Sequence, residues 1–302
     1  MKGPRVTSVR DARYGLIVTV LGTLIFVPDA LLIRLIHADL MDVAIWRGLF
    51  AALATTIGIG VFARDAIPTW RQLLSVPTLV FIVLHGGGSV LYLAALGHTS
   101  VANTALIAAT APFLAALMSW AFLGERITWL TGFCIAVVFA GVLVIASGSI
   151  GGGGLSGDIL ALLHAVSLAA YYVLLRYMGL RSQLVPATLG YVLTALIAWP
   201  LAPHAALSLH QIGLIGISGG VILTLGAALL LIGPRYLPAP EVTMITMLEV
   251  VASPVLVWVV IGENPGTRSV IGGAVIFAAL VAHTIWRWRS TPVLMGEAVK
   301  LG

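Results

Sequence analysis

The chain has 302 residues, of which 60% are hydrophobic and only 9% are charged, and its net charge is +5 at pH 7. Soluble domains carry about 25% charged residues, so this composition excludes an ordinary soluble enzyme and indicates a chain surrounded by lipid. The positive charge does not indicate nucleic-acid binding, because the basic residues lie singly between apolar runs and form no basic face.

Apolar segments follow one another along the chain, separated by short polar joints. Each is about 20 residues long, which is enough to cross the hydrocarbon core of a bilayer. The runs are continuous and lack the alternation of barrel strands, so they predict helices. The expected fold class is therefore an all-α integral membrane protein with ten transmembrane helices. The expected spans are 15–36, 42–63, 73–94, 101–123, 129–147, 155–176, 185–202, 212–232, 240–261 and 268–287.

One stretch of the sequence occurs twice. The run from Gly97 to Thr128 aligns without gaps with a run 138 positions later, and this places Gly124-Glu125 on Gly262-Glu263. Each half then holds five spans, an odd number, so equivalent helices cross the membrane in opposite directions. Inverted repeats of this kind place a transporter's substrate site near the midplane, between the halves. We expect repeats at 14–147 and 158–289, a Gly-rich linker at 148–157 and a tail at 290–302.

The distribution of lysine and arginine predicts the orientation. If the N-terminus is cytoplasmic, thirteen basic residues fall on the cytoplasmic side and only Arg34 and Arg268 fall in outer joints. We therefore expect a multi-pass protein of the plasma (inner) membrane with both termini in the cytoplasm.

The paired runs also carry a resemblance to a known family. APFLAALMSWAFLGERIT (Ala111–Thr128) and LEVVASPVLVWVVIGENPG (Leu248–Gly266) resemble the end of the EamA repeat, which defines the EamA-type family of the drug/metabolite transporter superfamily. The resemblance covers nearly the whole chain. It implies two five-helix repeats and a ten-helix secondary transporter, often an exporter of amino acids or related metabolites. The chain departs from the family at Leu248-Glu249-Val250, where the second repeat usually reads Leu-Glu-Pro.

Motifs for other chemistry are missing from the sequence. It has no phosphate-binding Gly-x-x-x-x-Gly-Lys-Ser/Thr loop and no His-Glu-x-x-His. Cys134 is the only cysteine, so neither an intramolecular disulfide nor a thiolate metal site is possible. We expect no cofactor and no metal.

Polar residues inside the spans are the candidate substrate-binding residues, because an ionisable group in hydrocarbon costs about 2.5 kcal/mol or more. Glu249, near the middle of the ninth span, either binds a substrate ammonium group or a coupling proton, or fixes helix packing. His85 and His164 either contact the substrate or bridge helices as core histidines. Tyr92 and Tyr171, on the same spans as these histidines, either stack on the substrate or serve as interfacial anchors or packing residues.

Four further polar residues lie nearer the ends of spans. Asn103 and its repeat equivalent Glu241 start the fourth and ninth spans, where they either face the cavity or satisfy backbone donors at a helix N-terminus. Asp29 and Arg47 lie in the outer halves of the first two spans. Buried charges are costly when apart, so we expect each to be paired, either with the other or with another partner, as part of an outer gate or as a static structural tie.

These observations predict a secondary transporter for a small polar or amphipathic organic solute. The resemblance alone makes that solute an amino acid or similar metabolite and the direction export. An importer of related metabolites and an intramembrane enzyme are the alternatives. Proton antiport and facilitated diffusion both fit the sequence, as do a monomer and a homodimer. The expected partners are the solute, protons where transport is coupled to them, and the lipid bilayer, with no nucleic acid.

Overall fold

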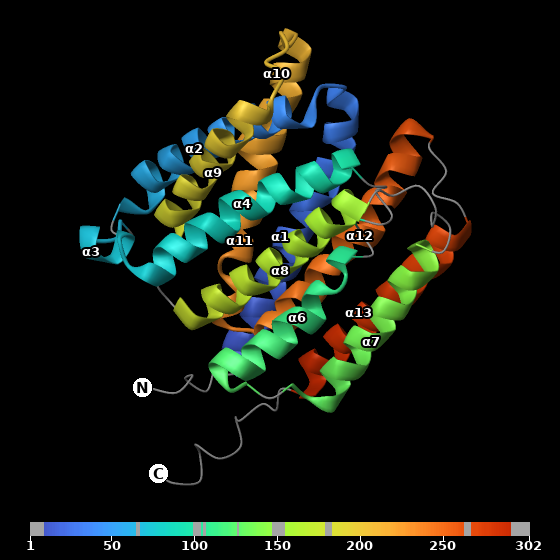
Figure 1. The fold of residues 1–302 in the computed structure, drawn as a ribbon. Coiled ribbons are helices and arrows are strands. Elements are labelled where there is room, and N and C mark those ends of the chain that lie inside the picture. Colours follow the sequence, from blue (N-terminus) through green and yellow to red (C-terminus); the bar gives the residue numbers. More distant parts are fainter. Residues whose placement is uncertain are drawn as a thin grey trace.

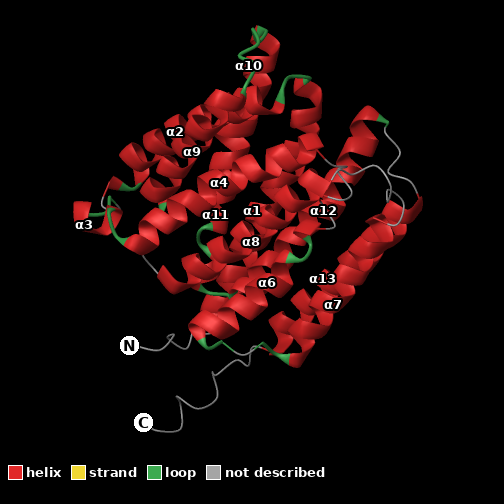
Figure 2. Cartoon of the chain, in the orientation of Figure 1, coloured by secondary structure: helices red, strands yellow, loops and turns green. Residues whose placement is uncertain are grey.

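The computed structural model describes residues 9–64, 67–98, 104, 107–125, 127–146, 155–178, 183–262 and 267–290. Nearly all of these residues are helical, and this part of the chain contains no strand (Figure 2). Asn103 lies outside the described residues, so the structure does not place this candidate.

The first half of the chain is a succession of helices (Figure 1). A four-residue helix, α3 (Trp70–Leu73), joins the second and third of them. The helix α6 continues directly into a wider π-helical turn, η2. The elements of this half, apart from α3, are α1 (Val9–Ile36), α2 (Leu40–Phe62), α4 (Val76–His98), α6 (Ala111–Met118), η2 (Ser119–Leu123) and α7 (Trp129–Ala146).

The second half repeats this plan with one elaboration. Its third span consists of α10 (Leu209–Gly216), the π-helical η4 (Ile217–Leu223) and α11 (Thr224–Leu230) in direct succession. Short 3₁₀ turns, η3 (Trp199–Leu201) and η5 (Gly233–Arg235), lie in two of the joints. The other helices are α8 (Leu155–Met178), α9 (Leu184–Ala198), α12 (Ala239–Ile261) and α13 (Thr267–Ser290).

The helices match the predicted spans in type and order. Among the described residues, seven helices are long and apolar enough to cross a membrane. Three shorter apolar helices, at 111–123, 129–141 and 270–283, lie within the three remaining expected spans, 101–123, 129–147 and 268–287. The predicted fold class, an all-α integral membrane protein, is confirmed.

The two halves pack as an inverted pair. Helix α1 packs on α11 and α12, and α8 packs on their counterparts α4 and α6. Helix α2 packs on its own counterpart α9, and α7 likewise packs on α13. Exchanging the halves therefore reproduces the same set of neighbours, as expected for two inverted repeats.

The ends of α6 and α12 show the inversion directly. Figure 1 shows η2, the continuation of α6, ending at the end of the bundle where α1 begins and α13 ends, which we call the terminal end. Helix α12 ends at the opposite, far end. Both helices stop at a left-handed glycine, Gly124 (φ 67°) and Gly262 (φ 79°), a conformation that favours glycine over other residues. The two glycines that the repeat aligns therefore end their helices in the same way, at opposite ends.

Several boundaries differ from the prediction. Helix α8 begins at Leu155, so the last three residues of the predicted linker 148–157 are helical, while 147–154 lie outside the described residues. Helix α9 gives way to a 3₁₀ turn after Ala198, because Pro200 has no N–H to continue the helix. Helix α12 stays helical through Val250 and Pro254, so no break replaces the missing Leu-Glu-Pro proline.

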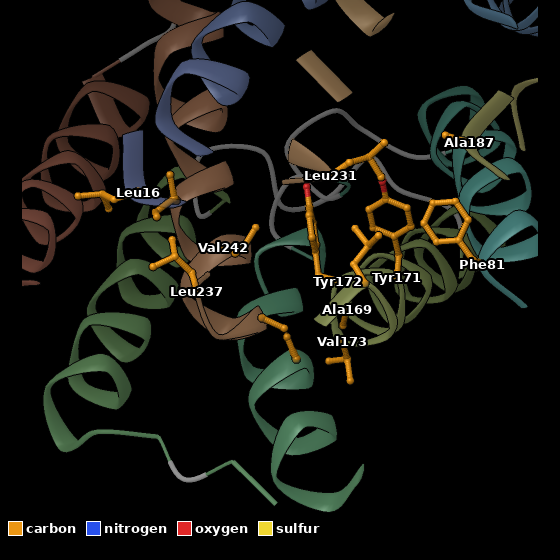
Figure 3. Close-up of a cluster of buried hydrophobic side chains, with 14 residues drawn as sticks. Leu16, Phe81, Ala169, Tyr171, Tyr172, Val173, Ala187, Leu231, Leu237 and Val242 are labelled. Atoms are coloured by element: carbon orange, nitrogen blue, oxygen red, sulfur yellow. The ribbon is translucent and has the colours of Figure 1, made fainter. Parts of the chain in front are cut away.

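Apolar clusters close the bundle towards both ends. Towards the terminal end, buried side chains of α1, α4, α8 and the segment 231–245 pack together (Figure 3). Towards the far end, Ile36, Val43 and Ile215 form a smaller cluster among α1, α2 and α10. Apart from Tyr171, which belongs to the first of these clusters, the polar candidates that the structure brings together lie on helix segments between the two.

Candidate functional site

A buried ion-pair network lies in the far half of the bundle. Arg47 of α2 donates from Nη2 to Oδ2 of Asp29 in α1 and from Nε to Oγ of Ser218, at 3.0 Å. Ser218 in turn donates to Oδ1 of Asp29 at 2.6 Å. The side chains of Arg47 and Asp29 are 11% and 9% exposed, and Ser218 is fully buried. The structure therefore pairs Asp29 with Arg47, as expected from the cost of burying either charge alone.

The π-helical element η4 places Ser218 in this network. A π-helical turn is one residue wider than an α-helical turn, and such turns occur frequently at functional sites. Next to Ser218, Gly219 packs so tightly that a Cβ atom would clash with the backbone carbonyl of Arg47. The absence of a side chain at Gly219 thus lets η4 approach α2 closely enough for Ser218 to reach both charges.

An aromatic cluster forms the terminal half of the site. The ring of His85 in α4 packs against both Phe81 and Tyr171, at centroid distances of 5.9 and 5.4 Å, and these two rings lie 5.2 Å from each other. Tyr191 of α9 meets the same ring edge-on at 4.7 Å. Within the described part of the chain, the buried Nε2 atom of His85 has no hydrogen-bond partner. His85 therefore has one polar atom available inside an otherwise apolar stack.

The repeats place these two clusters at equivalent positions. A Cβ atom on Gly86 would lie 2.6 Å from the carbonyl oxygen of Gly190, just as one on Gly219 would meet that of Arg47. These contacts make Gly86 equivalent to Gly219 and Gly190 equivalent to Arg47. The residues before the two glycines, His85 and Ser218, are then equivalent as well.

Large and small side chains are exchanged between the equivalent positions. In the far half, the long Arg47 side chain reaches the small Ser218. In the terminal half, Gly190 leaves room for the large His85 ring, whose Cδ2 would lie 2.5 Å from a Cβ atom at that position. The contact of η4 with α2 is therefore polar, whereas the equivalent contact of α4 with α9, on the other side of the midplane, is aromatic.

The remaining central candidates lie around these clusters. Tyr92 contacts the ring of His164 at 5.1 Å, and Nδ1 of His164 donates to the carbonyl oxygen of Gly88 at 2.9 Å. Glu249 of α12 interacts electrostatically with Asp29, Arg47 and Tyr92. No hydrogen bond or ion pair joins Glu249 to another described residue, so its charge is not neutralised by a direct partner.

A small cavity lies where α2, α4, α9 and η4 meet. Its volume is about 10 Å³. A space of that size holds at most one water molecule, so this part of the site is closed. Polar and apolar side chains share its wall, among them Arg47, Ser89, Tyr191, Thr194, Leu93 and Leu223.

The structure brings most of the predicted residues together. Asp29, Arg47 and Glu249 are linked by electrostatic interactions, and Tyr92 joins them to His164. Glu241 is buried in the first turn of α12, two turns before Glu249.

Three residues of the site were not predicted. Ser218 gave no signal, because a single serine within an apolar span is common. Tyr191 did give one, because its hydroxyl lies in the middle of a span, whereas tyrosines in membrane helices concentrate at the interfaces. Tyr172 is buried and meets Tyr171 edge-on at 5.0 Å, so it belongs to the aromatic cluster.

Comparisons with known proteins agree with this architecture. The family described as "EamA-like transporter family" matches residues 13–147 and 155–284. A crystal structure described only as that of a protein matches with a TM-score of 0.71 and 18% identity, over 94% of this chain and 99% of the other. At this identity the likeness shows the fold alone. No curated protein sequence matches the chain.

The fold and the closed polar site thus define a multi-pass helical membrane protein. With two family domains covering most of its length, the chain belongs to the EamA-like transporter family. It is therefore a membrane transporter, not an enzyme, and its substrate is a small molecule.

Proposed function

We propose that this transporter exports amino acids or related small metabolites by alternating access between its two five-helix halves. The observation that supports this most directly is the polar site enclosed by apolar clusters. Arg47 and Glu249 lie between a cluster containing Ile36 and Ile215 and the larger cluster of Figure 3. Separating either cluster would open the site to one side while the other stays closed.

Charge explains how a solute or a proton would be held there. Asp29 and Arg47 neutralise each other, so an ionised Glu249 leaves the site with one net negative charge. A substrate ammonium group or a proton on Glu249 would restore neutrality, which matters because an uncompensated charge is costly away from water. We propose that the two alternate on Glu249, which would couple export to proton entry.

The proposed orientation places the terminal end in the cytoplasm, because that side carries thirteen of the basic residues. Export then means loading from the terminal end, past the aromatic cluster, and release past Asp29 and Arg47. Import of the same solutes is the alternative direction.

The test is transport by purified protein in liposomes. A panel of labelled amino acids would be offered with and without a pH gradient, in vesicles of known protein orientation. We expect at least one member to move against its gradient when protons move the other way. An unchanged rate with and without the gradient would remove the proton-coupling proposal, and the preferred direction would separate export from import.

A charge-neutral variant of the key residue gives the matched comparison. Glu249→Gln keeps the size of the side chain but holds neither a proton nor an ammonium group, so proton-dependent transport should fall about tenfold or more. Asp39→Asn makes the same chemical change at an exposed residue that caps α2, where Asn caps as well as Asp. Equal activity of the two variants would contradict the role given to Glu249.

A further inference from the structure

We propose that Arg47 is the residue that binds the carboxylate group of the substrate when the closed cavity at the junction of α2, α4, α9 and η4 widens during alternating access. This inference rests on the proposed function, because it names the chemical class of solute that the site accepts. It assigns Arg47 a second role in addition to its pairing with Asp29. The substrate would then carry both a carboxylate, held at Arg47, and an amine, held near Glu249.

The guanidinium group of Arg47 has donors to spare. It carries five N–H donors in a planar fork that matches a carboxylate. The described contacts use Nε, which donates to Ser218, and Nη2, which donates to Asp29. Nη1 donates to no described residue, although the side chain lines the cavity. Once the cavity has widened beyond its closed, one-water volume, a carboxylate could therefore bind Arg47 without first breaking the existing network.

Asp29 acts as an internal carboxylate on the same guanidinium. Its Oδ2 accepts from Arg47 and its Oδ1 accepts from Ser218, which holds the group in place. When the site is empty, this pairing avoids an isolated buried cation. It also means that Asp29 competes electrostatically with a substrate carboxylate, so neutralising Asp29 should strengthen carboxylate binding.

The rest of the cavity wall suits a carboxylate. The hydroxyls of Ser89 and Thr194 donate to the backbone carbonyls of His85 and Gly190, at 2.9 and 3.1 Å. Tyr191 donates to the carbonyl of Leu223 at 3.4 Å, which is a long and therefore weak bond. Hydroxyl hydrogens rotate freely, so these groups can turn towards an oxyanion that enters the cavity.

Charge selects a carboxylate over a phosphate. A phosphate monoester would bring nearly two negative charges next to Asp29, Arg47 and Glu249, where only one cation is available. A carboxylate that arrives with an ammonium group adds no net charge. Binding such a zwitterion therefore leaves the net charge of the site unchanged.

The test measures ligand binding by purified full-length protein, as thermal stabilisation over a concentration series. The probes are L-leucine, isovalerate, which keeps the carboxylate and lacks the amine, and L-leucinamide, which keeps the amine and lacks the carboxylate. The variants are Asp29→Asn, which frees Arg47, and the double variant Asp29→Asn/Arg47→Gln, which removes both charges together. Arg71→Gln, at an exposed position in α3, is the control.

We expect carboxylate affinity to rise in Asp29→Asn and to fall again in the double variant. Asp29→Asn should bind isovalerate and leucine about tenfold more tightly than the unmodified protein. The double variant should lose about tenfold or more relative to Asp29→Asn, with little change for leucinamide. Equal binding of isovalerate by Asp29→Asn and the double variant, or no carboxylate binding by Asp29→Asn, would overturn the proposal.

The same probes separate this inference from the proposed function. Proton-dependent transport of leucinamide alone, without carboxylate binding, would retain the transporter's amine site and reject the role of Arg47. Carboxylate binding that depends on Arg47, in a protein that moves none of the amino acid panel, would reject the proposed substrate range and support Arg47.

Discussion

Nε of Arg176, near the end of α8, donates a hydrogen bond of 2.9 Å to Oε1 of Glu125, the residue after the glycine that ends η2. Nη1 of Arg176 also donates to the carbonyl oxygens of Pro234 and Arg235, at 3.4 and 3.2 Å. The two side chains are only 14% and 16% exposed, so water screens the pair weakly. Arg176 therefore ties the two repeats together at the terminal end of the bundle.

Replacing Arg176 with Gln should lower the free energy of unfolding by about 2 kcal/mol, because Glu125 and two backbone carbonyls lose a charged donor. Glu125→Gln should cost less, since an amide oxygen can still accept from Arg176. The measurement is the unfolding midpoint of purified protein in detergent. Arg71→Gln, in exposed α3, should leave the midpoint unchanged; a shift as large as that of Arg176→Gln would show that the tie does not stabilise the fold.

Ser218→Ala should destabilise the protein by about 2 kcal/mol, because Nε of Arg47 and Oδ1 of Asp29 both lose a buried partner. Thr56→Ala is the matched control. Its hydroxyl bonds only to the carbonyl of Ala52 in its own helix, so its loss should cost little. Chemical unfolding of the two variants side by side gives the comparison, and similar costs would argue against Ser218 as the bridge of the network.

Two glycines near η4 should respond oppositely to an added methyl group. Gly219→Ala places a Cβ atom against the backbone carbonyl of Arg47 and should cost about 1–3 kcal/mol. Gly216→Ala meets nothing within 4 Å and should be neutral or stabilise by up to about 1 kcal/mol. Thermal unfolding midpoints test the pair. A harmless Gly219→Ala would mean that α2 and η4 do not approach as closely as described.

His85→Phe should separate stability from transport. The ring stack with Phe81 and Tyr171 survives, and removal of an unsatisfied polar atom costs little or stabilises. Transport should nevertheless fall, because Nε2 is a buried polar atom of this cluster that has no described hydrogen-bond partner and can therefore bind a solute. Melting temperature and liposome transport, measured on the same preparation with exposed His98→Phe as control, test this. Full transport by His85→Phe would make His85 a packing residue.

The sequence predicted the architecture well, because continuous apolar runs and a repeat of an odd number of spans leave few alternatives. It also predicted that Asp29 and Arg47 would be paired, with each other or with other partners, since a buried charge is costly alone, and the structure shows the first of these. The physical cost of burial carried that prediction, and no spacing motif was needed.

The sequence did not predict the contacts that depend on helix geometry. Ser218 reaches the ion pair through a π-helical turn, and no pattern in the sequence marked that turn. The sequence did not indicate a partner for Glu125, because Arg176 lies 51 positions away on a helix whose rotation the sequence does not give. The exchange of Arg47 and Ser218 for Gly190 and His85 became visible only once the repeats could be compared in space.

The most direct test of alternating access is labelling of a single cysteine at the cavity wall. Ser89→Cys, in a chain with Cys134→Ala, would be exposed to a membrane-impermeant thiol reagent applied to either face of sealed vesicles. Alternating access predicts labelling from each face, in vesicles that remain impermeable to the reagent. Labelling from one face only, or from neither, would contradict it.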